Sequence, residues 1–157
     1  MIDDGKILLK VIETNKKNKI NTEVIQGGEL SSKKGFNLPN TEISQPALTD
    51  KDIKDAIFSI KQSVDWIALS FVRHESDIKS LINLIEKNTD HRIPVIAKIE
   101  KPEGVKNIDD IMKHASGIMV ARGDLGVEIN AAEIPLIQKK LVAVSYTHLR
   151  AHETESN

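Results

Sequence analysis

From Thr49 onward, short apolar runs alternate with stretches that carry the apolar stripe of an amphipathic helix. The apolar runs are Val64–Val72, Pro94–Ile99 and Gly117–Ala121, and each has the length of a strand that is buried on both faces. One strand and one helix together take about 25 to 30 residues, which is the repeat of a βαβ unit. Right-handed crossovers between such units place their strands parallel in one sheet. The pattern therefore predicts an α/β fold.

The helical stretches are recognised by their first residues and by their apolar spacing. Thr49 is a candidate N-cap, and Asp52 three residues later approximates a capping box. Ser76 is a candidate cap for the second helix. The striped positions are Ile53, Ala56, Ile57 and Ile60; Ile78, Leu81, Ile82 and Ile85; Val105, Ile108, Ile111 and Met112; and, on the last helix, Ile134, Ile137, Gln138 and Leu141.

The first 40 residues have a different pattern. Lys6–Glu13 is rich in aliphatic residues and follows the turn signal Asp3-Asp4-Gly5. Ile20–Gln26 alternates apolar and polar residues, as a half-buried strand does. Ser31–Asn40 shows no period and is expected to be a loop. Residues 1–45 therefore read as a small β region, and residues 46–144 as the α/β region.

Two parallel architectures compete for the α/β region. A Rossmann sheet would carry G-x-G-x-x-G after a strand, and the sequence contains no such motif. A TIM barrel places its chemistry where strands end, and the unusual polar residues of this chain lie there. However, a TIM barrel needs about 200 residues or more, and three strands cannot close one. The chain is therefore either a smaller fold or a piece of a barrel.

Composition excludes several classes of protein. Lys plus Arg total 22 and Asp plus Glu total 23, so the net charge is −1 and gives no electrostatic case for binding nucleic acid. The chain has no Cys, which excludes disulfides, zinc–thiolate sites and thiol nucleophiles. No apolar run is long enough to cross a bilayer. We expect a globular protein of the cytoplasm that binds neither membranes nor nucleic acid.

The end of the second apolar run, Lys98-Ile99-Glu100, is the first candidate site. Successive side chains of a strand alternate between faces, so Lys98 and Glu100 point the same way. A cation beside a carboxylate at the mouth of a parallel sheet is costly to bury without a function. A structural ion pair at a strand end explains the same two residues, and both interpretations stay open.

The third apolar run ends in Arg122-Gly123-Asp124-Leu125-Gly126. Gly123 can offer a backbone N–H to an anion, and Asp124 can supply an oxygen to a hard cation such as Mg²⁺. A glycine-rich βα turn with a helix-capping Asp is the plainer alternative. An Arg-Gly-Asp adhesion tripeptide would need an exposed extracellular loop, which nothing in the sequence suggests.

The two segments together would form an anion-handling site. If Glu100 and Asp124 end neighbouring parallel strands, they lie about 5 Å apart and can share one divalent ion. Lys98 would then stand beside that ion. Phosphoryl transfer needs this combination of positive charge around the moving group and a metal that neutralises it.

Two further pairs of residues could bind a ligand. Lys33-Lys34 before Gly35 could hold nucleotide phosphates, although such a pair is more often a solvated turn. His148 and His152 have the i, i+4 spacing of metal ligands on a helix, but two ligands are too few for a site.

Several segments together resemble the pyruvate kinase family. They are Ile2–Gly5, Ser32–Pro39, Leu69–Arg73, Ile96–Glu100 and Gly117–Glu128, and the resemblance runs from Met1 to about Val144. Lys-Ile-Glu followed at this spacing by Met-Val-Ala-Arg-Gly-Asp-Leu-Gly is highly specific. The resemblance implies a TIM barrel with a small β-barrel domain inserted after its third strand. This chain would contribute the end of that inserted domain and about three of the eight barrel strands.

The resemblance also implies an activity and roles for single residues. The family transfers phosphate from phosphoenolpyruvate to ADP, giving pyruvate and ATP in glycolysis, with Mg²⁺ or Mn²⁺ and with K⁺. Lys98 matches the lysine that stabilises the phosphoryl group in transit and binds substrate. Glu100 and Asp124 match the metal ligands, and Gly123 and Asp124 match the site for the substrate carboxylate. Lys34 matches a contact to the nucleotide phosphates. Asp4 is expected to lie by the hinge and to line the cleft.

The same resemblance implies what the chain lacks. The K⁺ ligands, a substrate-side arginine, a threonine after the next strand and the C-terminal effector domain have no counterpart in the sequence. The isolated chain is therefore expected to be inactive, whereas a full-length member is expected to be a homotetramer.

The resemblance stops after Val144. Ser145–Asn157 shows no period of either kind and is similar to the translation of a sequencing adapter, so we expect residues 145–157 to be a non-native tail. Two other functions stay open: a non-catalytic βαβ binding module, and a Mg²⁺-dependent aldolase or lyase that acts on pyruvate or phosphoenolpyruvate. The second of these gives no role to Lys34 or to the β region.

Overall fold

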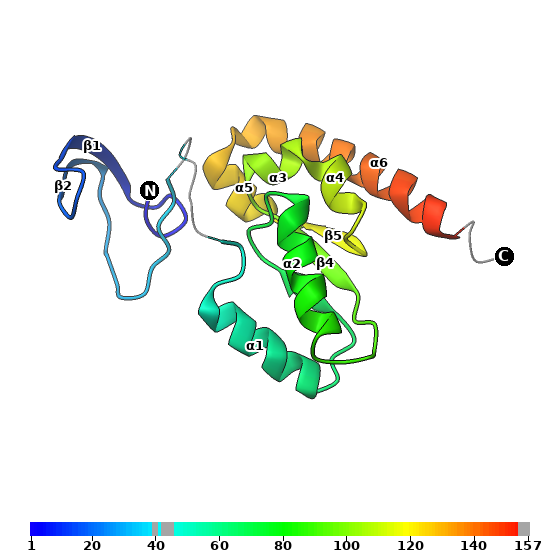
Figure 1. The fold of residues 1–157 in the computed structure, drawn as a ribbon. Coiled ribbons are helices and arrows are strands. Elements are labelled where there is room, and N and C mark those ends of the chain that lie inside the picture. The colour runs from blue at the N-terminus through cyan, green and yellow to red at the C-terminus, as the bar shows by residue number, and fades with distance from the viewer. Residues whose placement is uncertain (39–40, 42–45, 154–157) are drawn as a thin grey trace.

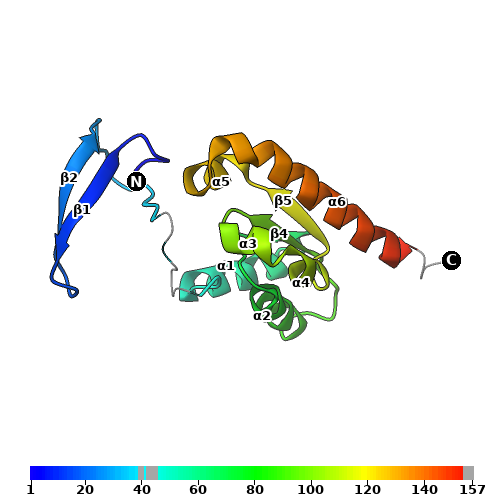
Figure 2. The same cartoon turned by 90° about the horizontal axis from the view of Figure 1, so that it is seen from above.

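The computed structural model describes residues 1–38, 41 and 46–153, with side chains described as far as residue 148. Some sequence predictions fall on residues outside the described ones. They concern the boundary between residues 45 and 46, Pro39 of the Ser32–Pro39 segment, Asn40 of the expected loop, and the last four residues of the expected tail. A two-stranded sheet and a three-stranded sheet account for all strands among the described residues. In both views the two-stranded sheet stands apart from the helices and the larger sheet (Figures 1 and 2).

The N-terminal part is an antiparallel hairpin of β1 (Leu8–Thr14) and β2 (Ile20–Gln26). The expected turn before it is present, because Asp3, Asp4 and Gly5 all adopt positive φ, at 52°, 54° and 88°. The expectation that the second strand is half-buried is wrong, because every residue of β2 is exposed. Most apolar side chains of the hairpin therefore face solvent: Val11, Ile12, Ile20, Val24 and Ile25 are each more than half exposed.

The α/β part begins at α1 (Asp50–Lys61), and its N-cap confirms the sequence prediction. The Thr49 backbone N–H donates to Asp52 Oδ2 at 2.9 Å, and the Asp52 N–H donates to Thr49 Oγ1 at 3.3 Å, which closes the capping box. Ala56 and Ile60 of the predicted stripe are buried. The helix therefore begins and packs as the sequence indicates.

The expected parallel sheet is also present. β3 (Ile67–Leu69), β4 (Val95–Ile99) and β5 (Gly117–Val120) pair in parallel in the order β3-β4-β5. The first strand is much shorter than the expected Val64–Val72, and Trp66 before it is 53% exposed. Each strand is joined to the next through helices, as βαβ units are.

Helices cover one face of this sheet. Val95, Ala97 and Ile99 of β4 are buried, whereas Ile96 and Lys98 on the other face are only partly buried. α2 (Glu75–Glu86) contacts β4, and α6 (Ile134–Glu153) contacts β5. The fully buried side chains of this core include Val72, Ile78, Leu81, Ile99, Ile108, Ile111, Met112 and Leu141.

Three features of the helices differ from the sequence predictions. α2 is preceded by His74 as its N-cap rather than by Ser76, because Asp77 Oδ2 accepts the N–H groups of Arg73 and His74 at 2.9 and 3.0 Å. The single helix predicted from Val105 to Met112 is divided into α3 (Pro102–Lys106) and α4 (Ile108–Met112). Asn107 separates them, and its side chain donates to the Arg73 carbonyl at 2.8 Å.

The third difference concerns the segment after β5. The segment for which a glycine-rich turn was the plainer alternative is instead α5 (Arg122–Glu128), followed by the 3-10 helix η1 (Ala131–Glu133). α6 then runs past Val144 to Glu153, through residues in which the sequence shows no period. No helix among the described residues is long and apolar enough to cross a membrane.

Candidate functional site

Parallel pairing gathers the candidate residues at one edge of the larger sheet. Leu69 of β3 pairs with Ala97 of β4, and Ile99 of β4 pairs with Val120 of β5. The Ala121 N–H continues this ladder and donates to the Ile99 carbonyl at 3.2 Å. The residues that follow the three strands therefore meet at the carboxyl edge, where ligands bind in parallel α/β sheets.

Lys98 and Glu100 are in contact, as the alternation of strand side chains predicts. Lys98 Nζ lies 2.6 Å from Glu100 Oε1. The Glu100 side chain is 3% exposed and the Lys98 side chain is 27% exposed. Among the described residues, Glu100 is the one charged residue classed with the buried core. A carboxylate at this depth needs partners for both of its oxygens.

The end of β3 supplies the remaining partners. The Phe71 N–H donates to Glu100 Oε2 at 2.8 Å, and Lys98 Nζ donates to Ser70 Oγ at 3.1 Å. Phe71 adopts φ 56°, a conformation that is strained for an aromatic residue. In this conformation the Phe71 N–H points at Glu100, and the aromatic ring remains 53% exposed. The Lys98–Glu100 pair is thus held by two consecutive residues of the neighbouring strand end.

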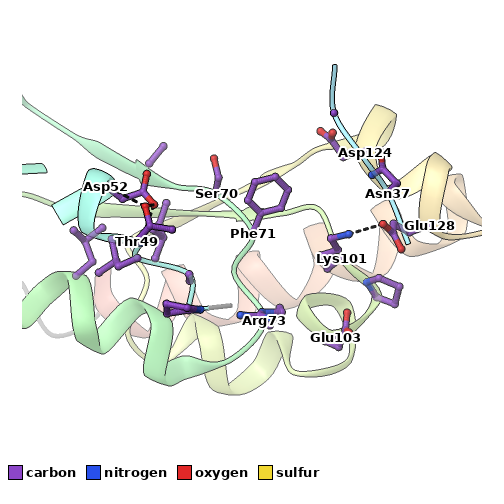
Figure 3. A pocket seen from close by; sticks show the side chains of 18 of the residues that line it. Asn37, Thr49, Asp52, Ser70, Phe71, Arg73, Lys101, Glu103, Asp124 and Glu128 are labelled. Carbon is purple, nitrogen blue, oxygen red and sulfur yellow. Dashed lines mark hydrogen bonds and ion pairs between the residues drawn. The ribbon is translucent and has the colours of Figure 1, made fainter. Parts of the chain in front are cut away.

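The third segment carries Asp124 on the first turn of α5. Asp124 is exposed, and it makes no hydrogen bond or ion pair with any described residue. Gly123 is exposed as well, and a Cβ added there would meet nothing within 4 Å. At the other end of the helix, Glu128 is ion-paired with Lys101 (Figure 3). Gly123 and Asp124, two of the residues expected to bind substrate, are therefore accessible.

A pocket of about 970 Å³ opens beside these residues. Asp124, Ser70 and Phe71 line it, and so do Lys101 and Glu128 (Figure 3). Asp4, Gly35, Phe36 and Asn37 of the N-terminal part line the same pocket, which agrees with the expectation for Asp4. Its place by a hinge stays a prediction. Lys98, Glu100, Gly123 and Lys34 are not among its described lining residues.

Lys34 is engaged by a partner in its own part of the chain. Its Nζ lies 2.9 Å from Asp3 Oδ1, and Lys6 Nζ lies 3.2 Å from Asp3 Oδ2. The hydrogen bonds from Lys34 and then Lys6 lower the pKa of the Asp3 carboxyl below its usual value. A nucleotide phosphate would have to compete with Asp3 for Lys34.

The carboxylates suit a hard divalent cation in their chemistry. Glu100 and Asp124 both supply oxygens, which are the ligands that Mg²⁺ prefers. Asp124 has no competing partner among the described residues, whereas both oxygens of Glu100 already accept a hydrogen bond or ion pair. The described residues contain no group of three His, Cys, Asp or Glu placed to hold a metal. A metal here would take its other ligands from substrate oxygens and water, as Mg²⁺ commonly does.

Of the pair His148 and His152, only His148 has a described side chain. His148 Nε2 lies 3.8 Å from Asp109 Oδ1, and the His152 side chain lies outside the described residues.

Comparison with known proteins decides the family. The barrel-domain model of pyruvate kinase matches residues 1–152. The chain belongs to the pyruvate kinase family. It is 50% identical over 143 residues to a pyruvate kinase of Geobacillus stearothermophilus and 48% identical over 143 residues to one of Bacillus licheniformis. These alignments cover 90% of the chain but 24% of each relative, so the chain spans about a quarter of their length. A pyruvate kinase of Corynebacterium efficiens is 46% identical over 145 residues, which are 92% of the chain and 30% of that relative.

Sequence reasoning gave no role to four residues that shape the site. Ser70 and Phe71 lie in a segment that resembles the family, but their contacts with Lys98 and Glu100 depend on strand pairing. Lys101 directly follows Glu100, and Glu128 lies four residues after Asp124. If the segment had been recognised as a helix, the i, i+4 spacing of Asp124 and Glu128 would have placed both carboxylates on the same face of it.

Proposed function

We propose that this chain is an internal segment of a cytoplasmic pyruvate kinase that transfers phosphate from phosphoenolpyruvate to ADP. The observation that carries the proposal is the family match over residues 1–152, which contains every candidate site residue. The Lys98–Glu100 pair at the carboxyl edge of a parallel sheet supports it. In this proposal residues 46–144 supply about three of the eight strands of a TIM barrel, and residues 1–45 end a small inserted β domain.

Each candidate residue then has a chemical role. Glu100 and Asp124 hold Mg²⁺ or Mn²⁺, which when bound neutralises charge on the transferring phosphoryl group. Lys98 places its ammonium beside that group and stabilises it in transit. The backbone N–H groups of Gly123 and Asp124 bind the substrate carboxylate, because α5 begins there and its first N–H groups have no partner within the helix. Lys34 contacts the nucleotide phosphates once it leaves Asp3.

The proposal includes what other parts of a longer protein would supply. K⁺ ligands, the remaining barrel strands and the contacts of a homotetramer lie outside residues 1–144 in this proposal. It also takes residues 145–157 as a non-native tail, although the family model matches as far as residue 152. The isolated 157-residue chain therefore forms no measurable pyruvate. Sequencing the source DNA across codons 140 to 160 tests the tail. A frame that runs on into another barrel strand supports the proposal, and the same tail followed by a stop codon contradicts it for this product.

Activity is tested by exchange with a relative. The 143 matching residues of the Geobacillus stearothermophilus enzyme are replaced by those of this chain. We expect ADP-dependent pyruvate formation, measured with a coupled lactate dehydrogenase assay. Lys98→Met and Glu100→Gln should each reduce the turnover of the chimera by at least about a hundredfold. Lys98→Met removes the cation beside the moving group, and Glu100→Gln removes a charged ligand of the metal. Lys113→Met, at an exposed ion pair with Asp110, is the matched control. A folded chimera that is inactive, or activity unchanged by Lys98→Met, would refute the proposed role.

A further inference from the structure

A buried ion pair lies in the wall of the pocket that Asp124 also lines. Lys101 Nζ donates to Glu128 Oε1, and the two side chains are only 13% and 4% exposed (Figure 3). The other ion pairs outside the Lys98–Glu100 pair, among the described residues, each include a side chain that is more exposed than either of these two. Burying two charges is costly. A buried ion pair therefore either holds its two elements in a specific geometry or could be replaced by apolar residues without loss of stability.

The pair joins the two elements that carry the candidate metal ligands. Lys101 directly follows Glu100 and is the N-cap of α3. Glu128 is the last residue of α5 and lies one turn after Asp124, so both carboxylates are on one side of that helix. The Lys101–Glu128 contact therefore fixes the end of β4 to the helix that carries Asp124.

The helix α5 depends on such a contact because its own sequence supports it weakly. Two of its seven residues are Gly123 and Gly126, and glycine is among the poorest helix formers. Its N-cap, Ala121, makes no side-chain capping bond. Leu125 is fully buried and holds the middle of the helix, while α6 and η1 pack beside it. Lys101 is the partner that holds its C-terminal end on the side of the sheet.

We propose that Lys101 and Glu128 are positioning residues that set the separation of Asp124 from Glu100 and thereby the affinity for the divalent cation. This inference rests on the proposed function, which makes Glu100 and Asp124 the metal ligands. Partners that orient metal ligands in this way typically change metal affinity by about 10- to 100-fold when they are removed.

The first test measures binding of Mn²⁺ alone to the 157-residue chain by electron paramagnetic resonance, without nucleotide or substrate. We expect Lys101→Met and Glu128→Gln each to weaken Mn²⁺ binding by about tenfold or more. Lys101→Arg keeps the charge and should restore most of the affinity. Lys113→Met, which removes an equally charged but exposed partner, should leave the affinity unchanged.

The second test follows hydrogen exchange of the α5 amides in the metal-free chain by mass spectrometry. Lys101→Met should accelerate exchange in α5 relative to Lys113→Met, because the end of the helix is released. A single substitution leaves one buried charge unpaired, so the double variant Lys101→Met/Glu128→Gln, which has neither charge, is measured in parallel. The double variant should retain its fold and still bind Mn²⁺ about tenfold more weakly.

The outcomes separate the two proposals. If the unsubstituted chain binds Mn²⁺ and the double variant binds it equally well, the positioning role is wrong while the metal site stands. Faster exchange in α5 with unchanged Mn²⁺ affinity would show a purely structural pair and would also overturn the inference. If the unsubstituted chain is protected from exchange but binds no Mn²⁺, the assignment of Glu100 and Asp124 as ligands fails, and the positioning role fails with it.

Discussion

Lys98 and Glu100 lie two residues apart on one face of the end of β4, with 2.6 Å between Lys98 Nζ and Glu100 Oε1. Ser70 and Phe71, from the end of the neighbouring strand, complete the hydrogen bonds of this pair. The structural ion pair that the sequence left open as one interpretation of Lys98 and Glu100 is therefore present. It is compatible with the functional interpretation, because a preorganised cation and carboxylate at a sheet edge are also what phosphoryl transfer needs.

Removing Lys98 should destabilise the fold. Lys98→Met leaves the buried Glu100 carboxylate with the Phe71 N–H as its remaining described partner, and we expect the free energy of unfolding to fall by about 1 to 3 kcal/mol. The value lies below that of a fully buried pair because Lys98 is 27% exposed. Urea denaturation followed by circular dichroism measures the change. An unchanged midpoint would show that Lys98 does not stabilise the buried Glu100 carboxylate.

Gly104 should not tolerate a side chain. A Cβ at this buried position of α3 would lie 2.5 Å from the Val72 carbonyl oxygen, which belongs to the backbone and cannot turn away. Gly104→Ala should therefore lower the free energy of unfolding by about 1 to 3 kcal/mol. Gly126→Ala in α5 is the matched control, since a Cβ there meets nothing within 4 Å and alanine favours the helix by about 1 kcal/mol. Equal melting temperatures for the two variants would contradict the close contact between α3 and Val72.

The N-cap of α1 should depend on pH. The side-chain hydrogen bond from Thr49 lowers the pKa of Asp52, so the stabilisation from this carboxylate is present above its unfolded pKa. It is lost as the pH falls through the lowered folded value. Thr49→Ala should cost about 1 kcal/mol at neutral pH and should raise the Asp52 pKa toward its usual value. Thermal unfolding between neutral and acid pH measures this, with Ser80→Ala in the middle of α2 as the control. A cost that does not shrink in acid would argue against the capping box.

Asp3 should report on the position of Lys34. The hydrogen bonds from Lys34 and Lys6 lower the Asp3 pKa, and the ion pair is lost as the pH falls through that lowered value. Lys34→Met should raise the Asp3 pKa, which carboxyl carbon shifts in a nuclear magnetic resonance titration would show. Lys51→Met, which removes a lysine paired with Asp55 on α1, should not. If added ADP also raises the Asp3 pKa, Lys34 has moved from Asp3 to a phosphate; no shift with bound ADP would count against its nucleotide role.

Tertiary contacts explain where sequence reasoning failed. The N-cap of α2 is His74 and not the predicted Ser76, because Asp77 accepts the backbone N–H groups of Arg73 and His74. The single helix predicted after β4 is divided at Asn107, because the Asn107 side chain donates a hydrogen bond to the Arg73 carbonyl, 34 residues away. α5 was missed because two glycines hide its helical pattern, and the burial of Leu125 and the contact of Glu128 with Lys101 are not visible in a linear pattern.

The sequence by itself determined the features that depend on local periodicity and on neighbours along the chain. These are the three parallel strands and most of the helices between them, the Thr49 capping box, the shared face of Lys98 and Glu100, and a pattern specific enough to indicate the family. Only the tertiary structure decided which distant groups complete the site, namely Ser70 and Phe71 against Lys98 and Glu100, Asp3 against Lys34, and Lys101 against Glu128. The physical reason is that a buried charge takes its partner from whichever backbone or side chain the packing brings near, and that choice has no period in the sequence.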